Sequence, residues 1–400
     1  MSLKILQICF RMPWPLKDGG AIAMYQLSTG LVNEGCQLSV LVPETNKHEA
    51  DFFQLPELLR ENINFKKTRI NSDITVFGAL INLFSTWPYY ISRYRNRNFN
   101  KLLTQTLQED QYDIIIVESL KMSPYLSLIR NYSQSKVLLR THNVEFLIWE
   151  RMKSSVKNPL KKVFLNIMVN RLQKYELKVI NDFDGILSIT QTDADYFHSR
   201  GLTKPCHVVL SGIDFERFKA QNIKVEFNSL FHLGALNWLS NLEAVEWFLN
   251  KVWPEIYKRY PFLKFYIAGR NTPEKLLNSQ IPGVVISGEV DDAIQFMLAR
   301  QIMIVPLLSG SGMRIKIAEG LALGKTIIST SVGAEGIGLT HAENVFIADS
   351  PENFISVIEM LVENPELVEK TGKNALEFAR RNLDNREIIR KMMVFLNNNK

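Results

Sequence analysis

The chain has 400 residues, of which 46% are hydrophobic and 22% are charged, and its formal net charge is +6. This composition is typical of a folded globular protein and excludes disordered and fibrous classes, while the length predicts two domains of about 200 residues. The three cysteines, Cys9, Cys36 and Cys206, lie far apart without the spacing of metal ligands, which indicates buried thiols in a reducing compartment.

The positive charge is concentrated in the first half of the chain. Residues 1–213 contain 26 Lys and Arg against 19 Asp and Glu, whereas residues 214–400 contain 21 against 22. This asymmetry indicates an anionic partner for the first half, either phospholipid or a phosphorylated acceptor, although solvated lysines on helices would give the same count. Residues 1–16 are too short and too interrupted for a signal peptide, and no apolar run reaches the length of a spanning helix, so we expect a cytoplasmic protein.

Apolar runs alternate with amphipathic segments along the first half. A strand is predicted at residues 3–9, a helix at 21–34 and further strands at 38–42, 113–117, 136–140, 185–189 and 207–210. The runs are nearly continuous in Val, Ile and Leu, which is typical of parallel strands that are covered on both faces by helices. The first half therefore predicts a doubly wound α/β domain.

The second half repeats this pattern. Strands are predicted at residues 229–233, 262–268, 283–287, 302–306 and 326–330, and residues 377–396 read as a charged amphipathic helix. We place the domain boundary after Ile213, giving domains 1–213 and 214–384, with a last helix at about 377–400 that can pack back on the first. Two such domains bind ligands where the carboxyl ends of their strands face each other across a cleft.

The loop after the strand that ends at Pro306 is the most informative segment. Glycines let a diphosphate approach the backbone, and a helix that starts near Gly312 would offer its N–H groups and its dipole to an anion. Two cations in the first turn of that helix favour a bound phosphate, although a plain strand–loop–helix turn is the alternative. The predicted donor-binding residues here are Ser309, Gly310, Ser311, Gly312, Met313, Arg314, Ile315 and Lys316.

Glu319 lies seven residues after Gly312, about 10 Å along a helix axis. A carboxylate at that offset can accept hydrogen bonds from the vicinal hydroxyls of a ribose while the diphosphate sits at the helix start. A surface salt bridge with Lys316, three residues earlier, would also explain the pair.

Neither a G-x-G-x-x-G nor a G-x-x-x-x-G-K-[ST] loop occurs, which removes the main support for dinucleotide oxidoreductases and P-loop proteins. Gly19 and Gly20, after the first strand, are either a turn or a second donor contact. His142 lies in the polar run 140–145 directly after a strand, where it can contact a sugar or serve as a structural histidine. No cluster with metal-ligand spacing appears.

The chain resembles the retaining glycosyltransferases of family 4, which have the GT-B fold of two Rossmann-like domains. The resemblance covers nearly the whole chain and is carried in order by Gly19-Gly20, by residues 140–145, by Ser211-Gly212-Ile213-Asp214, by residues 233–241, by Ser287-Gly288-Glu289-Val290 and by residues 309–320. It implies a nucleotide diphosphate sugar as co-substrate, no further cofactor, no required metal and retention of anomeric configuration.

The resemblance also assigns residues. Of the family's two donor-site glutamates eight positions apart, the second matches Glu319, which is implied to hold the ribose, but the first is Ser311. The family's Arg and Lys phosphate pair is missing around residues 235–237, and Arg270, Arg314 or Lys316 can replace it. Val290 is assigned to the donor site as well.

We therefore predict a hexosyltransferase of polysaccharide biosynthesis, acting on a lipid-linked or cell-envelope saccharide. A sugar-nucleotide epimerase of the same fold and a non-catalytic sugar-nucleotide binding protein are the alternatives. The stretch between Phe77 and Lys101 and a second basic stretch at 151–178 combine aromatic, aliphatic and basic residues, which predicts a peripheral position on the inner face of the plasma membrane. The competing interpretation is a core covered by solvated cations. No nucleic-acid partner is expected.

Overall fold

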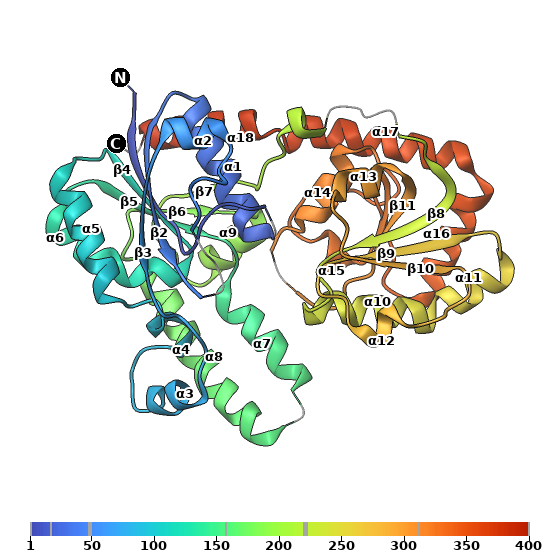
Figure 1. Ribbon diagram of the computed structural model, residues 1–400, viewed down its shortest axis with the longest axis horizontal. Helices are drawn as coiled ribbons and strands as arrows, with labels where there is room; N and C mark the ends of the chain where they lie inside the picture. The colour runs from blue at the N-terminus through green and yellow to red at the C-terminus, as the bar shows by residue number, and fades with distance from the viewer. Residues whose placement is uncertain are drawn as a thin grey trace. The chain divides into compact units, whose positions relative to one another are not determined.

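The computed structural model describes residues 2–16, 18–46, 50–156, 158–218, 223–310 and 312–398, with the side chains of residues 154, 155 and 160 excepted. The chain forms two compact units, Met1–Gly212 with Asn385–Lys400, and Ile213–Asp384. Each unit is a parallel sheet with helices on its two faces (Figure 1). The predicted fold class, two doubly wound α/β domains, is confirmed.

The first unit contains a seven-stranded sheet in the order β3-β2-β1-β4-β5-β6-β7, in which every pair of neighbours is parallel. The order reverses between β1 and β4, the point at which open α/β sheets bind ligands. All five residues of β4 are buried, as expected for a strand covered on both faces. The strands are β1 (Lys4–Ile8), β2 (Gln37–Glu44), β3 (Ile63–Arg69), β4 (Ile114–Glu118), β5 (Lys136–Thr141), β6 (Gly185–Ser188) and β7 (Cys206–Val208).

The helices of this unit connect consecutive strands, and several of them lie past the ends of the strands. Helices α3, α4, α7 and α8 extend beyond the strands at the lower end of the unit in Figure 1. Tyr89, Tyr90 and Ile91 of α4 are buried, so this part of the predicted membrane stretch belongs to the core. The helices are α1 (Gly19–Asn33), α2 (Glu57–Asn62), α3 (Val76–Asn82), α4 (Tyr89–Ser92), α5 (Arg97–Glu109), η1 (Leu120–Tyr125), α6 (Leu126–Tyr132), α7 (Glu145–Ser155), α8 (Pro159–Val179) and α9 (Gln191–Ser199).

The end of the chain returns to the first unit. The single helix predicted at residues 377–396 is wrong, because α17 (Pro365–Asn382) ends in the second unit and α18 (Asn385–Asn398) packs on α1 of the first. The amide of Asn385 donates to the carbonyl of Gln26 at 2.9 Å. Gly30 of α1 faces Ile389 so closely that an added Cβ would lie 2.3 Å from its Cγ1.

The second unit contains a six-stranded parallel sheet in the order β10-β9-β8-β11-β12-β13. Its strands are β8 (Glu226–Leu233), β9 (Lys264–Ala268), β10 (Val284–Gly288), β11 (Arg300–Val305), β12 (Thr326–Ser329) and β13 (Phe346–Ile347). Its helices are η2 (Phe215–Phe218), α10 (Leu239–Lys251), α11 (Trp253–Arg259), α12 (Glu274–Leu277), α13 (Ala293–Leu298), α14 (Ile315–Ala322), α15 (Ser331–Ala334), α16 (Pro351–Glu363) and α17. Within the described residues, no helix combines the length and hydropathy needed to cross a membrane.

Candidate functional site

A buried ionic cluster lies at the carboxyl ends of β4 and β5 in the first unit. Glu118 is fully buried, and its Oε1 accepts a hydrogen bond from Gln7 at 2.8 Å and lies 3.3 Å from Nη1 of Arg140. Its Oε2 lies 2.6 Å from Nε2 of His142. The strand register brings the group together, since Glu118 is paired with Arg140 on the neighbouring strand.

His142 is neutral at neutral pH in this cluster. Burial lowers the pKa of its imidazole and outweighs the opposing effect of Glu118. Burial alone would raise the pKa of Glu118, but Arg140 and the hydrogen bond to His142 hold that pKa below its ordinary value. Because an ionised carboxylate only accepts hydrogen bonds, Nε2 of His142 is the donor and Nδ1 is left as an acceptor. A neutral imidazole held in this way can accept a hydrogen bond from a sugar hydroxyl.

Lys121 lies beside His142 and was missed by the sequence analysis. Its Nζ is 4.3 Å from the ring centroid of Phe10 and 5.3 Å from that of Tyr90, and Phe10 packs edge-on against His142 with centroids 5.5 Å apart. Within the described part of the chain it forms no ion pair. Its position shortly after the end of a buried strand was the signal, because His142 was selected for following the end of a strand.

The other charged residues of the run 140–145 have internal partners. Glu145 is buried and accepts a hydrogen bond from Tyr90 at 2.7 Å. The carboxylate of Glu176 accepts from the backbone N–H groups of Glu145 and Phe146 at 2.9 and 3.0 Å, which caps the start of α7. Glu145 is thus engaged within the first unit, and sugar contact by His142 stays a prediction.

Gly19 and Gly20 begin α1 behind Asp18, which caps the helix. Its Oδ1 accepts from the N–H groups of Gly20 and Ala21 at 3.0 and 3.2 Å, and its carboxylate pairs with Arg11. A Cβ on Gly20 would lie 2.8 Å from Nη2 of Arg11. Gly20 thus has a packing role, and two of the N–H groups that a diphosphate could use already have a partner. Donor binding by Gly19 and Gly20 stays a prediction.

The predicted phosphate loop joins β11 to α14 in the second unit. The helix begins at Ile315, with Arg314 as its N-cap residue, so the expected start near Gly312 is wrong by three residues. Gly310 and Gly312 have φ of +129° and +76°, conformations that favour glycine, and a Cβ on Gly310 would lie 2.7 Å from the Arg314 guanidinium. Met313 and Ile315 are half-buried, and Ser311 lies outside the described residues.

Ser309 connects this loop to α10. Its hydroxyl donates to Ser240 Oγ at 3.1 Å and lies 3.3 Å from a carboxylate oxygen of Glu243. The loop is therefore held against the first turn of α10, and its conformation depends on a helix that follows a different strand of the sheet.

Lys316, in the first turn of α14, has polar neighbours but no carboxylate partner among the residues that the structure describes. Its Nζ donates to Asn241 Oδ1 at 2.9 Å and lies 3.5 Å from Nε2 of His232. His232 is fully buried in β8, and its Nδ1 lies 2.9 Å from the carbonyl oxygen of Ile304. That carbonyl only accepts, so Nδ1 donates to it and Nε2 presents its lone pair to Lys316. The alternative of a Lys316–Glu319 salt bridge is wrong for the described residues.

The pKa of Lys316 is lowered to about 7, first by burial and then by the charge of Arg314. Burial, followed by the charge of Lys316, lowers the pKa of His232 well below its ordinary value, so this histidine is neutral. An anion bound beside Lys316 would favour the charged ammonium and raise its pKa again.

Glu319 is half-buried on α14, and burial raises its pKa to about 7 against the opposing charge of Arg217. It lies four residues after the helix start, about 6 Å along the axis, and not the 10 Å expected from Gly312. A carboxylate that is short of hydrogen-bond donors is suited to accept them from the two hydroxyls of a ribose.

Arg270 and Val290 follow the ends of β9 and β10 and are half-buried. The carbonyl of Arg270 accepts from the N–H of Leu236 at 2.9 Å, which joins the loops after β9 and β8. Since β10, β9, β8 and β11 are neighbours and parallel, their carboxyl ends share one sheet edge. The second unit thus brings its predicted donor residues to that edge, together with Asn241 and His232, which the sequence analysis missed.

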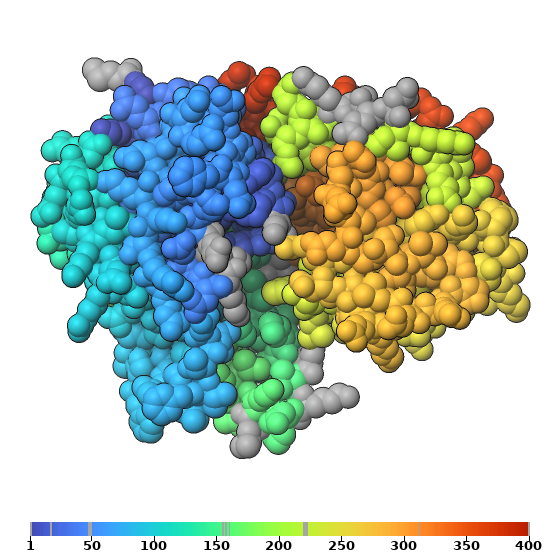
Figure 2. Space-filling view, in the orientation of Figure 1, coloured from blue at the N-terminus to red at the C-terminus, as the bar shows by residue number. Residues whose placement is uncertain are grey.

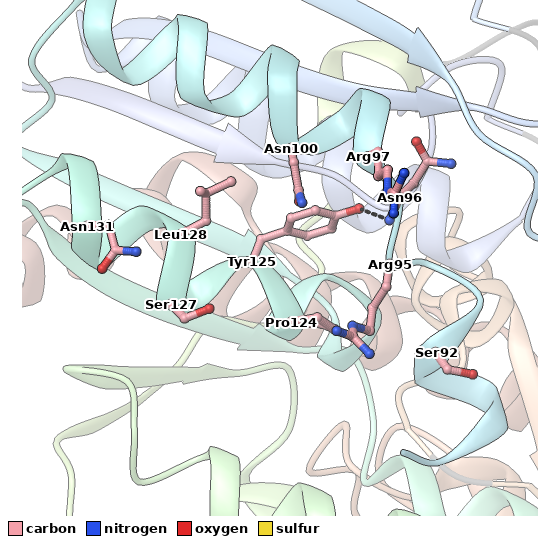
Figure 3. Close-up of a pocket in the computed structure, with 10 residues that line it drawn as sticks. All are labelled: Ser92, Arg95, Asn96, Arg97, Asn100, Pro124, Tyr125, Ser127, Leu128 and Asn131. Carbon is pink, nitrogen blue, oxygen red and sulfur yellow. Dashed lines mark hydrogen bonds between the residues drawn. The ribbon is translucent and has the colours of Figure 1, made fainter. Parts of the chain in front are cut away.

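A hollow of about 570 Å³ opens elsewhere in the first unit, between α4, α5, η1 and α6 (Figure 3). Arg95, Arg97 and Asn100 line it, and the N–H of Asn96 donates to the hydroxyl of Tyr125 at 3.2 Å across it. None of the predicted site residues lines this hollow, so we do not assign the donor to it.

Comparison with known proteins gives two family matches. Residues 17–217 match the family described as Glycosyltransferase Family 4, and residues 228–364 match the family described as Glycosyl transferases group 1. An uncharacterized 44.6 kDa protein in the cps region of Klebsiella pneumoniae is 25% identical over 398 residues, with 96% of this chain and 97% of that protein covered.

Solved structures are similar over the full length. The Anabaena protein HepE in complex with UDP and glucose has a TM-score of 0.68 at 14% identity, covering 99% of this chain and 100% of that one. Sucrose-phosphate synthase from Thermosynechococcus elongatus has a TM-score of 0.72 at 13% identity, covering 99% and 98%. At these identities the likeness establishes the fold.

Proposed function

Since the chain belongs to glycosyltransferase family 4, we propose that it moves a hexosyl group from a nucleoside diphosphate sugar to a saccharide acceptor, with retention of anomeric configuration. Family membership confirms the predicted resemblance. The complexes of HepE with UDP and with UDP-glucose support a nucleotide sugar as the donor.

One observation of the second unit supports the donor assignment most directly. Among the described residues, Lys316 in the first turn of α14 contacts two neutral acceptors and no carboxylate, and its pKa is lowered to about 7. A diphosphate at this helix start would accept from Lys316 and would also interact favourably with the helix dipole. The cation and the helix terminus would then stabilise the charge of the leaving diphosphate as the glycosidic bond breaks.

The remaining predicted residues have complementary roles in this proposal. Arg314, as the N-cap residue, adds a second cation beside the diphosphate, and Glu319 accepts from the ribose hydroxyls. His142 of the first unit, oriented by Glu118, accepts a hydrogen bond from the transferred sugar through Nδ1. These residues bind and orient the donor, and no step requires a further cofactor.

We propose a lipid-linked or cell-envelope saccharide as the acceptor, used in polysaccharide biosynthesis at the inner face of the plasma membrane. The support is the description of the Klebsiella pneumoniae relative as a protein of a cps region, together with the basic first half of the chain.

Incubation with a panel of radiolabelled nucleotide sugars and envelope lipids tests the proposal. The expected result is release of nucleoside diphosphate together with label in the lipid fraction, and NMR of the product should show the anomeric configuration of the donor. Isomerised nucleotide sugar would instead identify an epimerase, and binding without turnover across the panel would identify a sugar-nucleotide binding protein.

A further inference from the structure

Helix α3 has the reverse of the usual burial pattern. Its one buried residue is the polar Asn82, whose amide donates to Ser92 Oγ at 3.3 Å. Helices of globular proteins bury their apolar face, and a continuous exposed apolar surface marks an interaction site. The apolar residues in and around α3 are exposed: Ile74 by 62%, Val76 by 79%, Phe77 by 74%, Leu80 by 55%, Ile81 by 55% and Phe84 by 96%.

Helix α8 extends this apolar surface. Arg171 donates to the carbonyls of Asn82 and Leu83 at 2.9 and 2.8 Å, which fixes the end of α3 against α8. Val163 and Ile167 lie on the face of α8 that carries Arg171, about two turns and one turn further out, and both are exposed. The two segments meet at the lower end of the first unit in Figure 2, where α3 is light blue and α8 is green. We name the six residues around α3, with Val163 and Ile167, the apolar tip.

The surroundings of the apolar tip are basic. No Asp or Glu occurs between Asp73 and Glu109. The exposed cations of this stretch are Arg95, Arg97 and Lys101, and those of α8 are Lys161, Lys162, Lys174 and Lys178. Arg95 lies over the ring of Trp87, 4.3 Å from its centroid, and Trp87 packs on Tyr175 of α8, so this cation is held beside both helices.

We propose that the apolar tip docks the first unit on a membrane surface that contains anionic lipids. A bilayer supplies both of the required environments, because its acyl region takes up the apolar side chains while its headgroups neutralise the cations. An apolar protein partner would match the tip but would leave the surrounding cations without counter-charges. The inference concerns the first unit only and does not depend on the donor residues of the second.

Flotation of the full chain with vesicles tests the proposal. We expect binding to vesicles of phosphatidylcholine with phosphatidylglycerol, much weaker binding to phosphatidylcholine alone, and loss of most binding at 0.5 M salt. The double variant Phe77→Ser/Phe84→Ser should partition at least tenfold less, because two exposed aromatic anchors are removed. Lys161→Gln/Lys162→Gln should partition about 25-fold less, since each cation near such a surface contributes about fivefold.

Matched controls separate docking from folding. Phe227 and Phe262 are exposed by 74% and 57% in the second unit, so Phe227→Ser/Phe262→Ser should bind vesicles like the parent. All variants should keep the circular dichroism spectrum and the melting transition of the parent, which shows that both units are folded. The proposal is overturned if the parent binds neither vesicle, if both double variants bind like the parent, or if the apolar tip instead holds two copies of the chain together in sedimentation experiments without lipid.

Discussion

The protonation of Lys316 predicts how nucleotide affinity depends on pH. Its pKa of about 7 means that the free protein loses this cation as the pH rises, whereas a bound diphosphate favours the protonated form. Binding above pH 7 therefore requires proton uptake, and the affinity for UDP should fall about tenfold between pH 8 and pH 9, or about 1.4 kcal/mol. Over this interval Glu319 and UDP are already ionised, and His232 is neutral because its pKa is well below its ordinary value.

Calorimetric titration of UDP at several pH values measures the slope of UDP affinity against pH. Lys316→Met should bind UDP about 10- to 100-fold more weakly at pH 7, the cost of a lost charged hydrogen bond, and should show no such slope. Lys316→Arg keeps its charge throughout the interval and should also lose the slope. Unchanged affinity of the parent between pH 8 and pH 9, or the same slope in the Met variant, would refute the assignment.

Three further predictions follow from the same geometry. Glu319→Gln should weaken UDP binding but keep or raise the melting temperature at pH 8, because burial raises the carboxyl pKa to about 7 and ionisation above that pH costs the folded state stability. A loss of both UDP affinity and melting temperature would instead indicate a structural role. His142→Ala should lower turnover at least tenfold and leave UDP affinity within about twofold, and unchanged turnover would make His142 structural. Gly30→Ala should lower the melting temperature, since its Cβ would lie 2.3 Å from Cγ1 of Ile389, and should lower it clearly less in an Ile389→Ala background, which lacks that atom. Equal losses in both backgrounds would contradict this packing.

Hydrophobic runs were sufficient to predict eleven of the thirteen strands found in the described part of the chain, and the two that they missed have physical explanations. Strand β3 lies at one edge of its sheet with only Ile63 buried, and its sequence of Ile63, Asn64, Phe65 and two lysines lacks the continuous apolar run of a strand buried on both faces. Strand β13 has only two residues. The break after α17 contains no Pro or Gly that would have predicted it from the sequence. It coincides instead with a tertiary contact, the hydrogen bond from Asn385 to the carbonyl of Gln26.

The networks of the candidate site were harder to predict than its loops. Contacts of Glu118 with Gln7 and Arg140 depend on the register of three strands, and that of Lys316 with His232 depends on how α14 lies over β8. The sequence nevertheless contained a usable signal. A polar residue inside a run that is buried on both faces needs a partner, and Gln7, Arg140 and His232 are such residues.

The two networks differ in how their charge is balanced. In the first unit the carboxylate of Glu118 is neutralised by Arg140 and accepts two further hydrogen bonds, so the charges of this network balance without a ligand. In the second unit the ammonium of Lys316 meets only the neutral oxygen of Asn241 and the neutral nitrogen of His232 within the described residues. Even a half-buried cation is costly without a counter-charge, and the lowered pKa of Lys316 reflects that cost. The unbalanced charge lies at the start of α14, where an anion is also favoured by the helix dipole, and this is the physical reason for assigning the donor diphosphate to this edge of the second unit.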